Sequence, residues 1–187
     1  MAGVQGELEA TDREGTTEAG TTDPGGATAS LEGATVSVHV FVRSMAPPGG
    51  GHDEQVAVLE RLNALEDRGP VDAWNVTIWG ERLCECEVCT ATAAGRAVTE
   101  RMWELREWAG RAEGDVALPF ERREVTSEFA GTEIEALVPP RLTIAVYADE
   151  DLARVYPCTA DGTHHSVTEG LDWLESAGRR VPQPPAE

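Results

Sequence analysis

Three cysteines stand close together in the middle of the chain, as Cys84, Cys86 and Cys89. Cys86 and Cys89 form a Cys-x-x-Cys pair, a spacing that serves both metal binding and thiol redox chemistry. Zinc prefers about four thiolate or imidazole ligands in a tetrahedron. We therefore predict a metal site at Cys84, Cys86 and Cys89, with zinc as the candidate ion. A thiol-redox role and incidental cysteines are the two alternatives.

The fourth ligand is the difficult part of this prediction. In an extended segment Cys84 and Cys86 lie on one side and Cys89 lies on the other, so a turn near Glu87–Val88 is needed to bring the three together. The fourth cysteine, Cys158, is expected to end a strand at the edge of the sheet farthest from the second strand. Water or a nearby histidine is then the expected fourth ligand.

The histidines add little catalytic signal. His39 alternates within a predicted strand, which favours a core or edge position, and His52 begins a predicted helix. The pair His164–His165 follows an Asp161–Gly162 turn and is expected to be exposed, although it offers further metal ligands. The sequence has no Ser-His-Asp arrangement, P-loop or Gly-x-Gly-x-x-Gly motif. We therefore predict no catalytic residues and no organic cofactor.

Hydrophobic periodicity supplies the elements that position these residues. Alternating apolar residues predict strands at 36–43, 74–78, 142–147 and 152–156, with weaker strands at 120–125 and 134–138. Helical spacing predicts one helix around 58–65 that Gly69–Pro70 ends, a second at 94–112, and a third at 167–177 that ends at Gly178. The cysteines then lie in a loop after the second strand, at the carboxyl end of a parallel strand, where α/β proteins place ligands.

The predicted fold class is α+β (α/β), in the order strand, helix, strand, helix, strand, strand, helix. This order resembles the thioredoxin-like fold, a three-layer sheet, over residues 36–177, with a ferredoxin-like sheet as the alternative. Pro139–Pro140 precedes the strongest strand, where the thioredoxin-like fold carries its cis-proline. Residues 44–52 occupy the position of that fold's Cys-x-x-Cys but contain no cysteine. Dithiol exchange at that position is therefore not expected.

The charge of the chain points to a habitat. The net charge is -19, with 34 acidic residues against 15 basic ones, and every basic residue is arginine. At molar salt the Debye length falls to about 3 Å, so self-repulsion is screened and exposed carboxylates keep the surface hydrated. We therefore expect a protein of a halophilic archaeon. The sequence lacks a run of about 18 apolar residues and a signal-peptide core, which favours the cytoplasm over a membrane.

The domain organisation follows from composition. Residues 1–34 are rich in Gly, Thr, Ala and Glu without apolar periodicity, and we predict a disordered acidic tail there. Residues 35–177 form a single predicted globular domain, and 178–187 form a short flexible tail. The five tryptophans are expected to anchor the core and its rim.

Arginine is spaced regularly along the second predicted helix without forming a basic face. Arg96, Arg101, Arg106 and Arg111 recur every five residues, which advances about 500° around a helix and spreads them in a spiral. Glutamates lie among them, so we expect these arginines to be exposed to solvent and to form salt bridges with the glutamates. DNA is thus a candidate partner without a basic face to support it, alongside a protein partner or self-association.

Three stretches together carry a family resemblance: residues 40–48, 76–80, and 145–147 with 155–158. They are similar to a haloarchaeal family of small proteins labelled "HTH domain" proteins, over about residues 36–176. The resemblance implies DNA binding and transcriptional control, and little mechanism beyond these. A helix-turn-helix needs a second helix after a short turn, whereas Gly69–Asp72 leads from the first helix into a strand.

Three functional hypotheses remain from the sequence. The first is a non-enzymatic binding or regulatory protein of a halophilic archaeon, acting in transcription through a partner or as a dimer. The second is a metal- or thiol-linked sensor that uses Cys84, Cys86 and Cys89. The third is an enzyme that uses a cleft above the first two strands.

Overall fold

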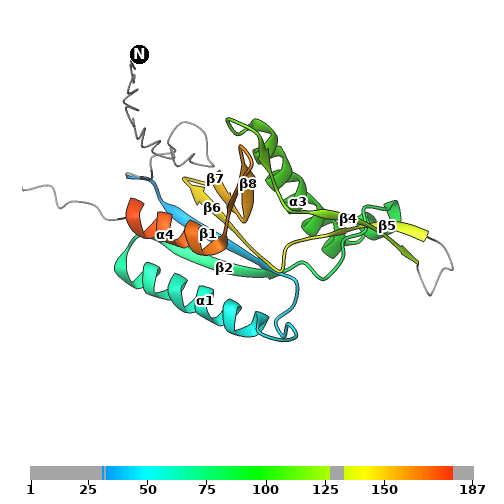
Figure 1. The fold of residues 1–187 in the computed structure, drawn as a ribbon, viewed down its shortest axis with the longest axis horizontal. Coiled ribbons are helices and arrows are strands. Elements are labelled where there is room, and N and C mark those ends of the chain that lie inside the picture. Colours follow the sequence, from blue (N-terminus) through cyan, green and yellow to red (C-terminus); the bar gives the residue numbers. More distant parts are fainter. Residues whose placement is uncertain (1–30, 32, 127–132, 179–187) are drawn as a thin grey trace, which may run out of the picture.

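The computed structural model describes residues 31, 33–126 and 133–178, and Figure 1 shows their arrangement. The helices are α1 (Gly51–Arg68), α2 (Glu87–Ala91), α3 (Ala93–Arg111) and α4 (Val167–Ala177). The strands are β1 (Val36–Val42), β2 (Ala73–Ile78), β3 (Val116–Ala117), β4 (Glu121–Thr126), β5 (Glu133–Val138), β6 (Leu142–Ala148), β7 (Asp151–Tyr156), β8 (Cys158–Ala160) and β9 (Thr163–His165). The protein is thus a mixed α+β fold.

A mixed four-stranded sheet forms the centre, in the order β2-β1-β6-β7. β1 runs parallel to β2 and antiparallel to β6, and β6 and β7 form an antiparallel hairpin. Asp149 and Glu150 both have positive φ at the tip of this hairpin, the backbone that its tight two-residue turn requires. Because β1 and β2 are parallel, their carboxyl ends lie at the same edge of the sheet.

The two faces of the sheet are covered by different helices (Figure 1). Alternate residues of β1, from Val36 to Val42, join the apolar side chains of α1 and α4 in one buried cluster. Phe41 and Tyr147 face the other way and join Met102 and Leu105 of α3 in a second cluster. β1 therefore alternates in sequence because its valines are buried on the α1–α4 face, while Ser37 and His39 on the other face are only half-buried.

The helix ends follow from local signals that the sequence also contains. α1 ends at Gly69, whose φ of 89° is a left-handed conformation that glycine adopts without steric cost. α4 begins with a capping box, because Ser166 accepts a bond from the backbone of Glu169 while Glu169 reaches back to Ser166. Burial of Leu171 and Leu174 then fixes the face that α4 turns to the sheet.

Two smaller β-structures flank the central sheet. β3, β8 and β9 form a three-stranded sheet, and β4 pairs with β5 in a separate two-stranded ribbon. Backbone hydrogen bonds between Leu83 and Leu137 tie the start of the cysteine segment to β5. The described residues include no helix that is both long and apolar enough to cross a membrane.

Several details differ from the sequence predictions. The cis peptide bond found in the described residues precedes Pro157 and not Pro140. The cysteine loop contains the short helix α2, and Cys158 begins β8 instead of ending a hairpin strand. Trp103 is 54% exposed, whereas Trp79 and Trp108 are buried. Leu31, which the sequence places in the acidic tail, is buried in the core, and most of both predicted tails lies outside the described residues.

Candidate functional site

The structure brings the three clustered cysteines together. The Sγ atoms of Cys84, Cys86 and Cys89 all lie within 4.8 Å of one another. Three thiolates at about 2.3 Å from a tetrahedral zinc ion lie about 3.8 Å apart, so small side-chain movements convert this cluster into a ligand set. Cys84 is half-buried, and Cys86 and Cys89 are exposed. The cluster is therefore accessible to an ion from solvent.

Helix α2 produces the turn that the sequence required for this convergence. Cys86 is its N-cap residue with extended backbone, and Thr90 donates its backbone N–H to the Cys86 carbonyl at 3.0 Å. Cys89 therefore returns to the same side as Cys86 after one helical turn. The sequence predicted a turn near Glu87–Val88, and α2 begins there.

Close contacts fix the junction between α2 and α3, directly after the cysteine segment. Thr92 ends α2 and caps α3, since its hydroxyl accepts the backbone N–H of Gly95 at 3.0 Å and donates to the Cys89 carbonyl at 2.8 Å. A Cβ atom on Gly95 would stand 2.0 Å from the carbonyl oxygen of Cys89. A glycine is thus required at position 95, and it fixes Cys89 against the first turn of α3.

Hydrogen bonds within the cluster lower the pKa of one thiol and raise the pKa of another. The backbone N–H of Cys89 and the side chains of Cys84 and Cys89 lower the pKa of Cys86 to about 7. The hydrogen bond to Cys86, followed by that to Cys84, raises the pKa of Cys89 to about 11. One thiolate is thus stabilised by two neighbouring thiol donors, an arrangement that suits metal binding and thiol chemistry alike.

Glu85 anchors the cluster to two other elements. Its carboxylate lies 3.9 Å from Arg106 of α3 and 3.8 Å from Arg122 of β4. The carboxylate is therefore engaged away from the three sulfurs, although Glu85 stands between two of them in the sequence. The two arginines also place positive charge beside a segment that holds up to three thiolates.

The other predicted ligands lie elsewhere. The group of potential metal ligands contains the three clustered sulfurs and does not include Cys158, His164 or His165. Cys158 pairs with His165 across β8 and β9 and is fully buried, which raises the pKa of its thiol to about 11. The prediction that both histidines are exposed is half wrong, because β8–β9 pairing turns His165 into the core while His164 stays exposed. Within the part of the chain that the structure describes, no fourth ligand side chain joins the three sulfurs.

The remaining histidines behave as the sequence indicated. His39 is half-buried on the α3 face of the sheet and hydrogen-bonds to the Thr77 hydroxyl at 2.7 Å. Burial lowers its pKa, and the positive charge of Arg101 adds to that effect. His52 is exposed at the start of α1.

The cysteine segment also contains two consecutive helices. α2 and α3 are joined through Thr92, whereas a typical helix-turn-helix has a turn of three or four residues. The sequence correctly predicted that α1 leads into a strand, and it did not predict α2. The arginines of α3 are engaged locally: Arg101 with Glu104 at 2.7 Å, Arg106 with Glu85, Arg111 with Glu107, and Arg96 with a backbone carbonyl.

Comparison with known proteins places the chain in a family. No curated protein and no solved structure matches it. A family model described as a helix-turn-helix domain matches residues 31–179, which span all the elements described above. The chain belongs to this helix-turn-helix domain family.

Proposed function

We propose that the protein is a non-enzymatic regulatory protein of a halophilic archaeon whose cysteine cluster binds one zinc ion. The observation that carries the proposal is the convergence of Cys84, Cys86 and Cys89, with all three sulfurs within 4.8 Å. A helix-turn-helix domain family suggests a regulatory role, and the cluster supplies a place where a signal enters. We also propose that the central sheet with α1, α3 and α4 is thioredoxin-like.

The charges around the cluster support zinc. Three thiolates and a divalent ion give a net charge of -1, and Arg106 and Arg122 together carry more positive charge than the Glu85 carboxylate they contact. Because thiolates are the ligands, binding releases the protons that the thiols carry, chiefly that of Cys89 with its raised pKa. The position left to water gives the ion an open site for a regulatory ligand.

A zinc measurement tests the proposal. We expect about one zinc per chain in protein purified without a metal-affinity tag. Cys86→Ser and Cys89→Ser remove two exposed ligands and should abolish binding. Cys158→Ala is the matched control, because Cys158 is buried outside the cluster, and it should retain the zinc.

Thiol titration of the same samples separates the alternatives. Zinc-bound cysteines should become reactive toward a thiol reagent only after chelation. A disulfide between Cys86 and Cys89 without zinc would contradict the zinc centre and favour the thiol-linked sensor. Reactive thiols without zinc or a disulfide would contradict both.

Transcriptional control is a second candidate function, favoured by the family match. Chromatin immunoprecipitation at native salt should give discrete genomic peaks if the protein acts at DNA, directly or through a partner. The Cys86→Ser variant should lose or redistribute those peaks if the cysteine centre controls the activity. A flat profile for the wild-type protein would argue against this function.

A further inference from the structure

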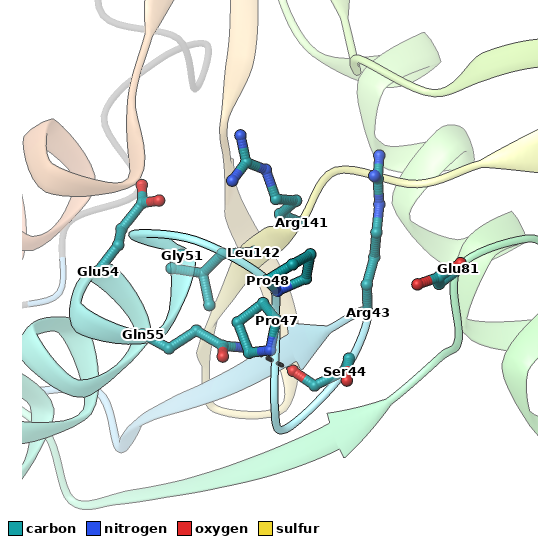
Figure 2. A pocket seen from close by; sticks show the side chains of 10 residues that line it. All are labelled: Arg43, Ser44, Pro47, Pro48, Gly51, Glu54, Gln55, Glu81, Arg141 and Leu142. Atoms are coloured by element: carbon teal, nitrogen blue, oxygen red, sulfur yellow. Dashed lines mark hydrogen bonds between the residues drawn. The ribbon is translucent and has the colours of Figure 1, made fainter.

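A pocket of about 240 Å³ opens at the edge of the sheet where β1 ends, apart from the cysteine cluster (Figure 2). It lies between the β1–α1 loop, the first turn of α1 and the start of β6. This edge carries the carboxyl ends of the parallel strands β1 and β2, the position at which open α/β sheets bind ligands. Its size is below the roughly 300–1,000 Å³ of pockets for drug-sized ligands, so it suits a small molecule.

Two arginines from different strand ends line the pocket. Arg43 follows β1, Arg141 precedes β6, and a backbone hydrogen bond from Arg43 to the Arg141 carbonyl holds the two segments together at 3.1 Å. The Arg43 side chain donates from Nε to the carbonyl of Pro139, which fixes the guanidinium (Figure 2 shows both side chains extending the same way). Two cations therefore extend from neighbouring strand ends into the lining of one pocket.

Neither guanidinium has a carboxylate partner within ion-pair distance among the described residues. Seven other described arginines each lie within ion-pair distance of a carboxylate. Burial lowers the pKa of Arg43, and the nearby charge of Arg141 lowers it further, while Glu121 and Glu81 act in the opposite direction. The pair is thus positioned against its own electrostatic repulsion.

The N-terminus of α1 adds to this positive potential. Gly51 is buried there, and a Cβ atom on it would stand 3.3 Å from Nη1 of Arg141 and 3.3 Å from Pro47. Arg141 therefore lies against the first turn of an 18-residue helix, at the end where a cation is disfavoured by the helix dipole. Asp53 and Glu54 lie in the same turn and oppose the positive end of the dipole.

We propose that this pocket binds a small molecule that carries one carboxylate or phosphate group, held by Arg43 and Arg141. A guanidinium group donates two parallel hydrogen bonds to a carboxylate or to a phosphate. A chloride ion, which is a single atom, cannot accept such a pair. Pro47, Pro48 and Leu142 form an apolar wall for the rest of the molecule. Glu54 and Glu81 flank the two arginines, so a second negative group or a nucleic-acid backbone is disfavoured (Figure 2).

Saturation-transfer NMR with three matched probes tests the proposal at a fixed molar KCl concentration. Benzoate and phenyl phosphate each combine an apolar ring with one oxyanion, and benzyl alcohol has the same ring without charge. We expect benzoate, phenyl phosphate or both to bind, and benzyl alcohol to bind far more weakly. Whichever anion binds more tightly identifies the carboxylate or the phosphate class.

Variants assign the binding to the pocket. Arg141→Gln should weaken the anion's affinity by about tenfold or more, since a charge-assisted hydrogen bond is lost. Arg43→Gln provides a second variant, and Arg111→Gln on the exposed face of α3 is the matched control that should bind normally. Thermal unfolding checks that each variant is folded. Absence of binding by both anions, equal binding of benzyl alcohol, or unchanged affinity in both pocket variants would overturn the proposal.

Discussion

At the residue scale, His39 shows how a strand position decides the chemistry of a side chain. Its ring stacks on Phe41 at 4.3 Å between centroids, and it shares a hydrogen bond with Thr77. Burial is the main cause of its lowered pKa, followed by the charge of Arg101, while Glu104 partly compensates. The surroundings of His39 thus lower its pKa and favour the neutral ring.

This environment predicts a pH dependence of stability. The pKa of His39 in the folded protein lies below the ordinary histidine value of about 6.5, so the unfolded chain binds more protons as the pH falls. The stabilisation is therefore present above about pH 6.5 and is lost as the pH drops toward the folded pKa. We expect His39→Gln to reduce the loss of stability between pH 7 and pH 5 in denaturant titrations, relative to wild type. His52→Gln, at an exposed position, should keep the wild-type slope; an unchanged slope in His39→Gln would contradict the assignment.

At the element scale, the packing of α4 on β7 depends on one small residue. A Cβ atom on Gly170 would stand 2.5 Å from Cδ2 of Tyr156, whose side chain is itself fully buried. α4 therefore approaches the sheet more closely than any other residue type at position 170 would allow.

Gly170→Ala should lower the free energy of unfolding by about 1–3 kcal/mol, because an overpacked core must shift the ring or the helix. Gly110→Ala is the matched control in α3, where an added methyl group meets nothing within 4 Å. That control should be neutral or stabilise the protein by up to about 1 kcal/mol, since alanine has the higher helix propensity. Equal effects in chemical denaturation would show that α4 does not pack as described.

The long periodic elements were predictable and the short ones were not. β1 and β6 alternate over seven residues each, so their burial is visible in the sequence. α2 has five residues without a buried position, and β8 and β9 have three each, so neither leaves a periodic signal. The pairing of β8 with β9 decides that His165 is buried, and this pairing is a tertiary contact.

The candidate sites divide in the same way. The spacing of Cys84, Cys86 and Cys89 indicated a ligand set, and the need for a turn was clear from the sequence. The pocket of Arg43 and Arg141 was missed, because the two residues are far apart in the chain and meet only through the pairing of β1 with β6. Strand register is set by the whole sheet, so it does not show in either local sequence.

At the scale of the whole molecule, electrostatics is dominated by the excess of carboxylates. The net charge is -19, and the ion pairs of the described residues involve mostly exposed side chains, which contribute little stability individually. Net self-repulsion should therefore outweigh the loss of these pairs when salt is added.

We expect the melting temperature to rise between dilute buffer and about 2 M KCl, as the Debye length falls to a few Å. Sorbitol at matched osmolality does not screen charge and should produce a smaller rise. A melting temperature that stays flat or falls with KCl would contradict adaptation to high salt.

The separation of the core into two clusters has a dynamic consequence. The sheet shields the α1–α4 side from the α3 side, and α3 is joined to the cysteine turn through Thr92 and Gly95. We therefore expect a change at the cysteines to affect Met102 and Leu105 of α3 more than the opposite layer. We expect amide hydrogen exchange to quicken in α3 on loss of the cysteine centre while α1 and α4 stay protected, so that one half of the molecule responds and the other half maintains the fold.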